Sequence, residues 1–355
     1  MKRALLNAAA APERVAPPGG PEVLAFHRTL PGYAPTALRA LPGEAAALGL
    51  GELLLKDENG RFGLPAFKIT GASWALERLL AARPGLRTVW AASAGNHGRA
   101  VARAAAQRGL VARIFLPLRT SRARADAIAA EGAEVVRVPG DYEQAVAAAA
   151  EAASEVGAAT LADVAYDASD PVANWVSDGY STVFAEAAEQ AGGPVDVVLC
   201  QIGVGSFAAA ATRFACHQEP AAVAIGFEPA TAACAMASLA AGRPVVIDTP
   251  GTSMAGLNCA TPSHTAWPTL RDGLTGCVTI SDAESHAAMR DLAAMGIVAG
   301  DCGAASLAAL RALVQDPECA ELARSARLGP ASRVLLVSTE GATDPEAYAE
   351  TLERR

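Results

Sequence analysis

Short apolar runs alternate with segments of helical periodicity along most of the chain after its first fifty residues. The apolar runs predict buried strands at residues 53–56, 88–92, 112–116, 134–138, 195–200, 222–227 and 333–337. The segments between them carry the apolar and polar spacing of amphipathic helices, most clearly at 72–82, 98–108 and 142–153. Because continuous apolar strands separated by helices are typical of parallel sheets covered on both faces, the pattern predicts an α/β fold with two lobes and a cleft between them.

The two predicted lobes are unequal in size. We expect residues 1–74 plus 190–355 to form the larger lobe and residues 75–189 to form a smaller α/β lobe. The first forty residues are rich in proline and glycine, above all at 17–21, and these residues interrupt helices and strands. We therefore expect this segment to wrap over the surface as an arm.

Composition narrows the possible functions. The chain has 355 residues, of which 52% are hydrophobic and 19% charged, so it can bury a substantial core. Its net charge of −8 argues against a nucleic-acid surface, because binding phosphates needs clustered cations. No apolar run approaches the roughly 20 residues of a membrane span, and Pro12, Glu13 and Arg14 follow the N-terminus too closely for a secretory core. These features predict a cytoplasmic protein that binds neither nucleic acid nor membranes.

The cysteines show no spacing typical of a disulfide framework or a metal site. Seven of them are scattered at positions 200, 216, 234, 259, 277, 302 and 319, without a C-x-x-C pair and without a histidine at metal-ligand spacing. This arrangement predicts reduced thiols, with neither a disulfide nor a bound metal.

Lys68 is the first candidate for chemistry. It stands between Phe67 and Ile69, just before the apolar helix predicted from residue 72. Because burial disfavours the charged ammonium, this setting is expected to lower the pKa of Lys68 and to favour the neutral amine that attacks a carbonyl group. A surface lysine with its apolar stem packed on the protein is the alternative interpretation.

A second candidate is the segment Ser93-Ala94-Gly95-Asn96-His97-Gly98, which joins a predicted strand to a predicted helix. Its glycines let the backbone approach a ligand, and the amides at the start of a helix attract anions. Asn96 offers both a donor and an acceptor to a hydroxyl or carboxylate. An ordinary glycine-rich turn would have the same composition.

A third segment, Gly203-Val204-Gly205-Ser206, follows the strand that ends at Cys200. Its backbone amides, small residues and hydroxyl suit a phosphate group. It is neither a P-loop nor a G-x-G-x-x-G motif, which favours a phosphorylated cofactor over a nucleotide.

The last candidate loop begins at Ser338 and Thr339, after the strand at 333–337. A hydroxyl at a strand end can meet a ring nitrogen of a ligand. Further along, Asp344 followed by Pro345 is typical of an N-cap and the first residue of a helix. Both roles can coexist because they use different residues.

Together these four segments resemble the fold-type II pyridoxal-phosphate enzymes, the group of the tryptophan synthase β-subunit and threonine dehydratase. The resemblance extends over nearly the whole chain. It implies two lobes of twisted, mostly parallel sheets flanked by helices, and pyridoxal 5'-phosphate bound as a Schiff base to Lys68. The cofactor-binding residues that it implies, besides Lys68, are Asn96, Gly203, Val204, Gly205, Ser206, and Ser338 or Thr339.

Within that group the chain looks most like the diaminopropionate ammonia-lyases. The matching segments are Leu30–Thr36, Arg61–Leu64, Ala66–Lys68, Gly95–Arg99, Gly179–Thr182, Met254–Leu257, Gly300–Ala304 and Thr339–Pro345. The resemblance implies a lyase that eliminates ammonia from 2,3-diaminopropionate to give pyruvate and ammonia, and a homodimer. Lys68 would remove the α-proton, and Asp163, in the segment Leu161–Tyr166, would be a second catalytic group. A helix cap or a hydrogen-bonded loop acid is the alternative role for Asp163.

On the substrate side, the implied residues are Ser93, Ala94, Gly95, His97, Thr252 and Ser253. His97 is expected to brace its loop and not to act as a base. The family has an acidic residue at the position of Ala94, used as a base toward the D-isomer. Because alanine cannot move a proton, we expect the L-isomer to be favoured.

Two other functions remain as alternatives. A serine or threonine dehydratase, or a β-replacement synthase, would use the same cofactor on a related L-amino acid. A nucleotide-binding α/β module without that cofactor is a third possibility, which the missing nucleotide fingerprint disfavours. In each catalytic case the partner is a small amino acid.

Overall fold

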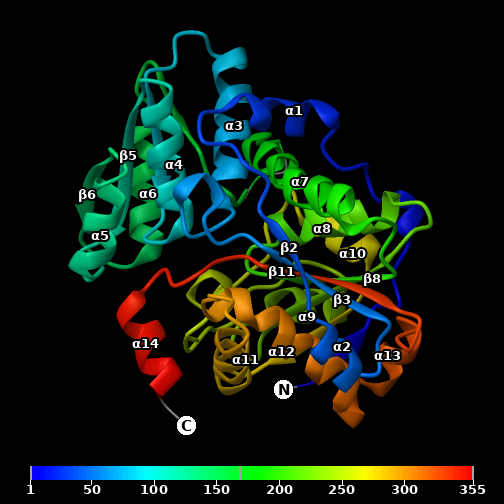
Figure 1. Ribbon diagram of the computed structural model, residues 1–355. Coiled ribbons are helices and arrows are strands. Elements are labelled where there is room, and N and C mark those ends of the chain that lie inside the picture. The colour runs from blue at the N-terminus through cyan, green and yellow to red at the C-terminus, as the bar shows by residue number, and fades with distance from the viewer. Residues whose placement is uncertain (1, 166, 168, 354–355) are drawn as a thin grey trace.

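Two sheets organise the chain, which the computed structural model describes for residues 2–165, 167 and 169–353. The described strands form a seven-stranded sheet in the order β1-β10-β9-β8-β11-β3-β2 and a four-stranded sheet in the order β6-β5-β4-β7. The edge strands β1 and β2 pair antiparallel, and the other strands of both sheets pair parallel. Figure 1 shows the smaller sheet at the upper left and the larger one below it. The predicted fold class is confirmed.

Seven of the eleven described strands coincide with the predicted apolar runs, and the other four have no predicted counterpart. The larger sheet contains β1 (Ala4–Leu6), β2 (Ala37–Ala40), β3 (Glu52–Asp57), β8 (Val197–Gln201), β9 (Val223–Pro229), β10 (Leu274–Ile280) and β11 (Arg333–Ser338). The smaller sheet contains β4 (Thr88–Ala92), β5 (Val111–Pro117), β6 (Glu134–Val138) and β7 (Ala158–Thr160). All seven predicted strands are present, and β4 and β6 have the predicted bounds.

Helices cover both sheets. They are α1 (Pro21–Thr29), α2 (Pro42–Ala47), α3 (Lys68–Ala82), α4 (Asn96–Gln107), α5 (Arg122–Ala129), α6 (Tyr142–Ala152), α7 (Val172–Ala191), α8 (Ser206–His217), α9 (Cys234–Ala241), α10 (Trp267–Gly273), α11 (Asp282–Ala294), α12 (Asp301–Gln315), α13 (Ala320–Ser325) and α14 (Pro345–Glu353). Short 3-10 turns lie at η1 (Pro12–Arg14), η2 (Arg61–Gly63), η3 (Ala255–Leu257) and η4 (Pro317–Cys319). Asp344 Oδ1 accepts a hydrogen bond from Ala347 N over 3.2 Å, so the predicted cap of the last helix is confirmed.

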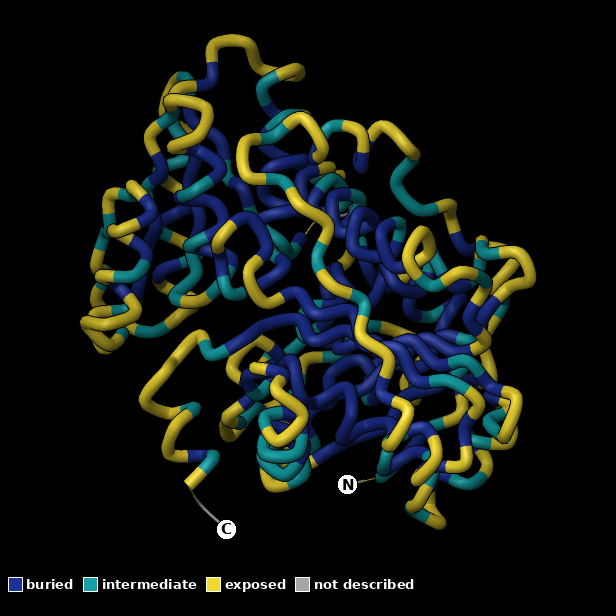
Figure 2. Tube along the Cα trace, in the orientation of Figure 1, coloured by how far each residue is buried: buried dark blue, intermediate teal, exposed yellow. Residues whose placement is uncertain are grey.

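Alternate residues of the central strands pack into two different cores. On one face of the larger sheet, Val198 and Cys200 join the apolar cluster that includes α3, α7 and α8. On the other face, Val197 and Leu199 join the cluster that includes α11 and α12. Side chains alternate across a strand, so one apolar run serves both layers. Figure 2 shows the buried strands between more exposed helices.

The N-terminal segment contains more regular structure than the sequence suggested. β1 pairs with β10, β2 pairs with β3, and α1 packs against α3 and α7. Pro21 opens α1, where a missing backbone N–H costs nothing. The proline-rich arm is therefore built into the larger sheet at two of its edges.

The loops that carry predicted site residues follow the carboxyl ends of parallel strands in both sheets. The loops after β3, β8 and β11 lie at one edge of the larger sheet, and the loops after β4 and β7 lie at one edge of the smaller sheet. The smaller sheet lies within the predicted segment 75–189, but residues 74 and 189 fall inside α3 and α7, and the exact division stays a prediction. Within the described ranges, the helices are too short or too polar to cross a membrane.

Candidate active site

Lys68 is the first residue of α3, and its side chain reaches a loop of the smaller sheet. Its Nζ atom donates a hydrogen bond to Asp163 Oδ2 over 2.5 Å. The segment before it is held to the loop after β11, because Gly341 N donates to Pro65 O over 2.8 Å. Lys68 and Asp163, the two predicted catalytic residues, are thus brought together although 95 positions separate them. Tyr166, at the end of the segment that carried the prediction for Asp163, lies outside the described residues.

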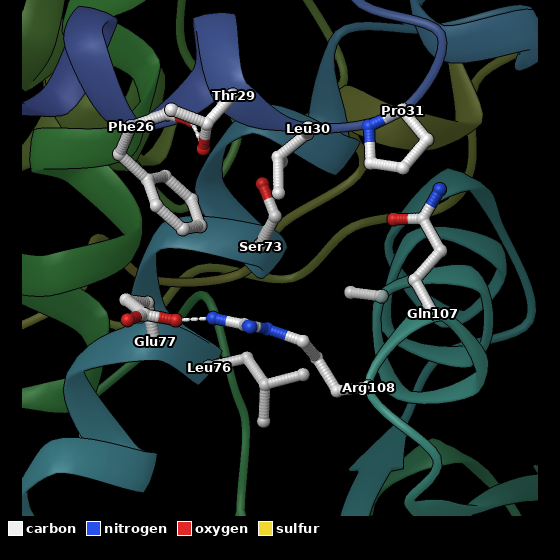
Figure 3. Close-up of a pocket in the computed structure, with 10 residues that line it drawn as sticks. Phe26, Thr29, Leu30, Pro31, Ser73, Leu76, Glu77, Gln107 and Arg108 are labelled. Atoms are coloured by element: carbon white, nitrogen blue, oxygen red, sulfur yellow. Dashed lines mark hydrogen bonds and ion pairs between the residues drawn. The ribbon is translucent and has the colours of Figure 1, made fainter.

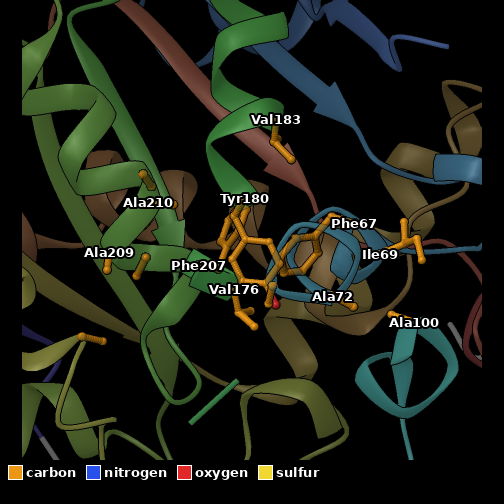
Figure 4. Close-up of a cluster of buried hydrophobic side chains, with 14 of the residues drawn as sticks. Phe67, Ile69, Ala72, Ala100, Val176, Tyr180, Val183, Phe207, Ala209 and Ala210 are labelled. Atoms are coloured by element: carbon orange, nitrogen blue, oxygen red, sulfur yellow. The ribbon is translucent and has the colours of Figure 1, made fainter. Parts of the chain in front are cut away.

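The aromatic rings of Phe67, Tyr180 and Phe207 pack together in the core next to the start of α3 (Figure 4). The ring of Phe67 lies 4.7 Å from that of Tyr180 and 4.5 Å from that of Phe207, measured between centroids. Lys68 Nζ lies 5.7 Å from the centroid of Tyr180. The Tyr180 hydroxyl is buried and has no hydrogen-bond partner among the described residues. One side of the ammonium is therefore dry, and a polar atom beside it is free to meet a ligand.

The Lys68–Asp163 contact determines the charge of both groups. Burial lowers the pKa of Lys68, but the Asp163 carboxylate more than offsets this, and the pKa lies above the usual lysine value. Burial raises the pKa of Asp163, yet His97 and Lys68 together bring it well below its usual range. The prediction of a lowered pKa for Lys68 is therefore wrong, because it considered burial alone and not a carboxylate 2.5 Å from the amine.

His97 lies directly behind this pair. Its Nε2 atom is 3.0 Å from the carbonyl oxygen of Leu161, which fixes the loop after β7. Its Nδ1 atom is 3.8 Å from Asp163 Oδ2 and has no hydrogen-bond partner within the described part of the chain. Burial lowers the pKa of His97 by more than the nearby Asp163 carboxylate raises it, and the Lys68 ammonium also lowers it. These contacts suit the predicted bracing role.

The rest of the loop after β4 is shaped by small residues. Ser93 Oγ accepts from Gly95 N over 3.4 Å, and Ala94 packs on the apolar core. A side chain at Gly98 would collide with the carbonyl oxygen of Ser93, so this turn requires glycine. A Cβ at Gly95 would have open space around it among the described residues. The loop therefore leaves room in front of Gly95.

Asn96 opens α4 and contacts the larger sheet. Its Nδ2 atom donates to Glu340 Oε2 over 2.5 Å. Glu340 Oε1 accepts from the backbone nitrogen of Cys302 over 3.2 Å. Asn96 thus lies at the junction of both sheets, where the sequence predicted a cofactor contact.

The glycine-rich loop of residues 203–206 is tightly packed at its base. Gly205 has a positive φ of 98° and caps α8, a conformation that favours glycine. A Cβ at Gly203 would lie 2.7 Å from the carbonyl oxygen of Gly256. Val204 O accepts from Ser263 N over 2.7 Å, and Ser206 Oγ donates to the carbonyl oxygen of Asp163 over 2.5 Å. The loop is therefore joined to the segment that carries Asp163.

Ser338 and Thr339 differ in their surroundings. Ser338 is the last residue of β11, one position beyond the predicted strand end, and its Oγ lies 3.5 Å from the carbonyl oxygen of Glu340. Thr339 Oγ1 accepts from Gln201 Nε2 over 3.3 Å. Both are buried. Which hydroxyl meets a ring nitrogen stays a prediction.

Thr252 and Ser253 have partners on α11. The Thr252 hydroxyl donates to Asp282, and Ser253 N donates to the same carboxylate over 3.0 Å. The Ser253 hydroxyl lies 3.0 Å from His286 Nε2. These contacts hold the loop on α11, and the predicted substrate contacts of the two residues stay predictions.

Three residues of the site were missed as functional candidates. Tyr180 and Glu340 both lie in segments that carried the family resemblance, which was the available signal. Ser263 connects two loops, because its Oγ accepts from Ala165 N over 2.9 Å and its own nitrogen bonds Val204. No local pattern marks it.

The site has the features that the predicted cofactor requires. Two buried polar atoms without hydrogen-bond partners among the described residues, His97 Nδ1 and the Tyr180 hydroxyl, belong to residues that adjoin the Lys68–Asp163 pair. A glycine-shaped helix start at Gly205 offers backbone amides to a phosphate. Over the described residues, no group of histidine, cysteine or acidic side chains could hold a metal ion. The residues therefore fit an organic, phosphorylated group.

A separate cavity of about 310 Å³ lies between α1, α3 and α4 (Figure 3). It is lined by Phe26, Thr29, Leu30, Pro31, Ser73, Leu76, Glu77, Ala104, Gln107 and Arg108. Glu77 and Arg108 form an ion pair across it. It contains none of the predicted site residues.

The family model, two relatives and a solved structure that resemble the chain all point to one group of enzymes. The family model described as "Pyridoxal-phosphate dependent enzyme" matches residues 29–340. The diaminopropionate ammonia-lyase of Salmonella typhimurium is 34% identical, covering 93% of this chain and 91% of that protein. The L-threonine dehydratase of Mycobacterium leprae is 30% identical, covering 93% of this chain and 73% of that protein. The crystal structure of the Escherichia coli diaminopropionate ammonia-lyase in complex with D-serine aligns with a TM-score of 0.89 at 30% identity, covering 99% of this chain and 96% of that one.

Proposed function

The chain belongs to the family of pyridoxal-phosphate-dependent enzymes, and from that premise we propose that it is an ammonia-lyase acting on 2,3-diaminopropionate. The reaction is an α,β-elimination that, with one water, yields pyruvate and two molecules of ammonia. The observation that carries the proposal is the Lys68 amine, placed 2.5 Å from a carboxylate where the loops of both sheets meet. The similarity to diaminopropionate ammonia-lyases over nearly the whole chain gives the substrate class.

The cofactor is pyridoxal 5'-phosphate, and we assign its contacts to residues that surround the amine. Lys68 would hold it covalently, and Asn96 would face its ring. The amides of Gly203, Val204, Gly205 and Ser206 would hold its phosphate, and Ser338 or Thr339 would meet its ring nitrogen. When bound, the cofactor supplies an electron sink for the charge that develops at the α-carbon of the substrate.

Lys68 and Asp163 would share the proton transfers. Lys68 Nζ, in its neutral amine form, would take the proton from the substrate α-carbon, and the electron pair of that bond would form the new carbon–carbon double bond. The electron pair of the β-carbon–nitrogen bond leaves with ammonia. A protonated β-amine leaves as neutral ammonia, and the Asp163 carboxylate, whose pKa is lowered, favours that protonated form of the substrate. The released enamine hydrolyses to pyruvate and the second ammonia.

The position of Ala94 bears on stereochemistry. Its methyl group packs on the core and cannot accept a proton. Removal of an α-proton from the face opposite Lys68 would need a base in this loop. We therefore propose that the L-isomer is the preferred substrate.

The first experiment is a pyruvate assay with separate L- and D-2,3-diaminopropionate, together with the variant Ala94→Asp. We expect pyruvate from the L-isomer, at least about ten times less from the D-isomer, and a gain of D-isomer activity in the variant. Equal activity on both isomers would refute the role of Ala94. Absence of pyruvate from both isomers, with the cofactor bound, would refute the lyase.

A dehydratase is the second candidate, favoured by the 30% identity to an L-threonine dehydratase over most of the chain. Assays with L-serine and L-threonine separate the two, because a dehydratase gives pyruvate or 2-oxobutyrate from them at higher kcat/KM than from diaminopropionate. A β-replacement synthase would instead need a second nucleophile for turnover.

We also propose that the enzyme is a cytoplasmic homodimer with lobes at 1–74 plus 190–355 and 75–189. The seven free cysteines support a reducing compartment. Light scattering of the purified protein measures the subunit number, and limited proteolysis locates the boundary between the lobes.

A further inference from the structure

The Glu340 carboxylate lies buried between the loops that carry the predicted cofactor contacts. Its Oε2 atom accepts from Asn96 Nδ2 over 2.5 Å, and its Oε1 atom accepts from Cys302 N over 3.2 Å. The residue is only 9% exposed. Two donors therefore reach this carboxylate, one from the start of α4 beside the smaller sheet and one from the first turn of α12 beside the larger sheet.

The backbone of Glu340 has little freedom to move. Its carbonyl oxygen accepts from Gly300 N over 3.0 Å, and the residue pairs with Ala66 in an antiparallel bridge two positions before Lys68. A side chain at Gly303 would collide with the same carbonyl oxygen. The carboxylate is thus presented from a fixed position on the larger sheet.

This fixed acceptor determines how the Asn96 amide is turned. An asparagine side chain fits either way round by shape, but an ionised carboxylate only accepts hydrogen bonds, so the NH₂ end faces Glu340 in its ionised form. Burial raises the pKa of Glu340, and the hydrogen bonds from Cys302 and Asn96 oppose that rise. The NH₂ group has a second hydrogen that remains for another acceptor. A hydrogen bond to a charged group is also stronger than one between neutral groups.

We propose that Glu340 is the positioning residue of Asn96: it fixes the orientation of the amide toward the cofactor ring and holds the start of α4 against the larger sheet. The inference rests on the proposed function, because it takes Asn96 as a cofactor contact. Glu340 acts only through Asn96 and does not itself exchange protons with the substrate.

The test is a double-mutant cycle on the holoenzyme with Glu340→Gln, Asn96→Ala and the combined variant. The readouts are the visible absorption band of the bound cofactor, its rate of release on dilution, and kcat and KM. We expect Glu340→Gln to shift the band, speed cofactor release about tenfold and lower kcat about tenfold while KM changes less than about twofold. The combined variant should match Asn96→Ala within about twofold, because both remove the same contact.

A matched control comes from Glu131, a buried carboxylate that also contacts α4 but from within the smaller lobe. It pairs with Arg99 and Arg103 and does not contact Asn96. Glu131→Gln should leave the absorption band and the release rate as in the wild type. Equal effects of Glu131→Gln and Glu340→Gln would show that any lost carboxylate loosens α4, and would overturn the proposal.

Two further outcomes would also overturn it. If the effects of Glu340→Gln and Asn96→Ala multiply in the combined variant, Glu340 does not act through Asn96. If Glu340→Gln does not fold, Asn96→Asp places a second carboxylate against Glu340, and cofactor release as slow as in the wild type would contradict the contact. The band and the release rate need no substrate, so they test Glu340 even where diaminopropionate gives no pyruvate.

Discussion

Two lysines of the chain, Lys56 and the partly exposed Lys68, differ in burial and in hydrogen-bond partners. Lys56 on β3 donates to Thr36 O, Glu186 Oε2 and Gln190 Oε1, at 2.7, 2.8 and 2.8 Å. Lys68 on α3 donates to Asp163 alone among the described hydrogen bonds. The side chain of Lys56 is 0% exposed, whereas that of Lys68 is 20% exposed. An ammonium has three donors, so Lys56 has none left for a ligand, whereas Asp163 occupies one donor of Lys68.

The charged groups around Lys56 balance one another. Arg61 donates to both Glu58 and Glu186, so two cations and two carboxylates neutralise one another inside the protein. Burial lowers the pKa of Lys56, and Glu58 and Glu186 offset part of that effect. Its pKa thus moves down, whereas the pKa of Lys68 moves up. The direction of a pKa shift therefore does not decide which lysine is reactive, and our assignment of that role to Lys68 rests on its exposed surface and its fewer hydrogen-bond partners.

The largest expected effect is the loss of cofactor attachment and activity when Lys68 is replaced. Lys68→Ala should abolish cofactor attachment and lower activity at least about 10⁴-fold, because the amine both holds the cofactor and moves the proton. Borohydride reduction of the wild-type holoenzyme, followed by peptide mass mapping, should place the cofactor on Lys68. The chain has only two other lysines, Lys2 and Lys56, so the map is unambiguous. Label on Lys56, or an active variant, would break the comparison.

The next largest effect is a loss of stability when Lys56 is replaced. Lys56→Met should lower the free energy of unfolding by about 3–5 kcal/mol, because it leaves an excess of negative charge in a closed network. The visible absorption and kcat of the folded fraction should remain. Urea unfolding of the holoenzyme measures the difference. Lys2→Met, at an exposed position, is the matched control and should change stability by less than about 0.5 kcal/mol. A stable Lys56→Met protein that has lost its cofactor would contradict the structural role.

A smaller effect is expected from the single partner of Lys68. Asp163→Asn should lower kcat about 10²-fold, the usual size of an acid–base contribution, while cofactor attachment persists. Asp167→Asn, an exposed acid of the same loop, should leave kcat unchanged. Steady-state kinetics on both variants provide the measurement. A kcat of Asp163→Asn equal to that of the wild type would leave Asp163 as a structural residue.

The strands and helices could be predicted from the sequence more fully than the contacts between side chains. The strands β4 and β6 were predicted with their bounds, because short runs rich in β-branched and apolar residues favour strands locally. The strand β10 and the long helix α7 were not predicted, since Gly276 and Gly179 interrupt patterns that only their neighbours explain. A Cβ at Gly179 would lie 2.7 Å from the Cα of Gly71, a close approach of two helices that no single segment records.

The candidate site residues were also easier to predict than the partners that they contact. Lys68, Asn96 and the loop of residues 203–206 follow from local motifs, and the structure brings them to the carboxyl ends of the strands. The partner of Asn96 lies 244 positions away, and that of Lys68 lies 95 positions away. Pairings at such separations set the pKa values and the orientation of amides, so they could not be predicted from sequence patterns alone.

The smallest expected effect is a difference in acid sensitivity around Lys56. Burial raises the pKa of Glu186, but Arg61 and Lys56 together bring it below its usual value. A carboxylate whose pKa is lower in the folded than in the unfolded protein stabilises the fold fully above its unfolded pKa, near 4.5, and loses that contribution as the pH falls further. Each unit of difference corresponds to about 1.4 kcal/mol.

Urea unfolding of the holoenzyme at several pH values between 6 and 3.5 would therefore show a steeper loss of stability in the wild type than in Glu186→Gln, which has no charge to lose. Glu189→Gln, on the same helix but in an exposed pair with Arg28, should keep the wild-type slope. Equal slopes for wild type and Glu186→Gln would mean that the network is not charged in the way its contacts indicate. The contrast between Lys56 and Lys68 would then rest on burial and on hydrogen-bond partners, and not on a balance of charges around Lys56.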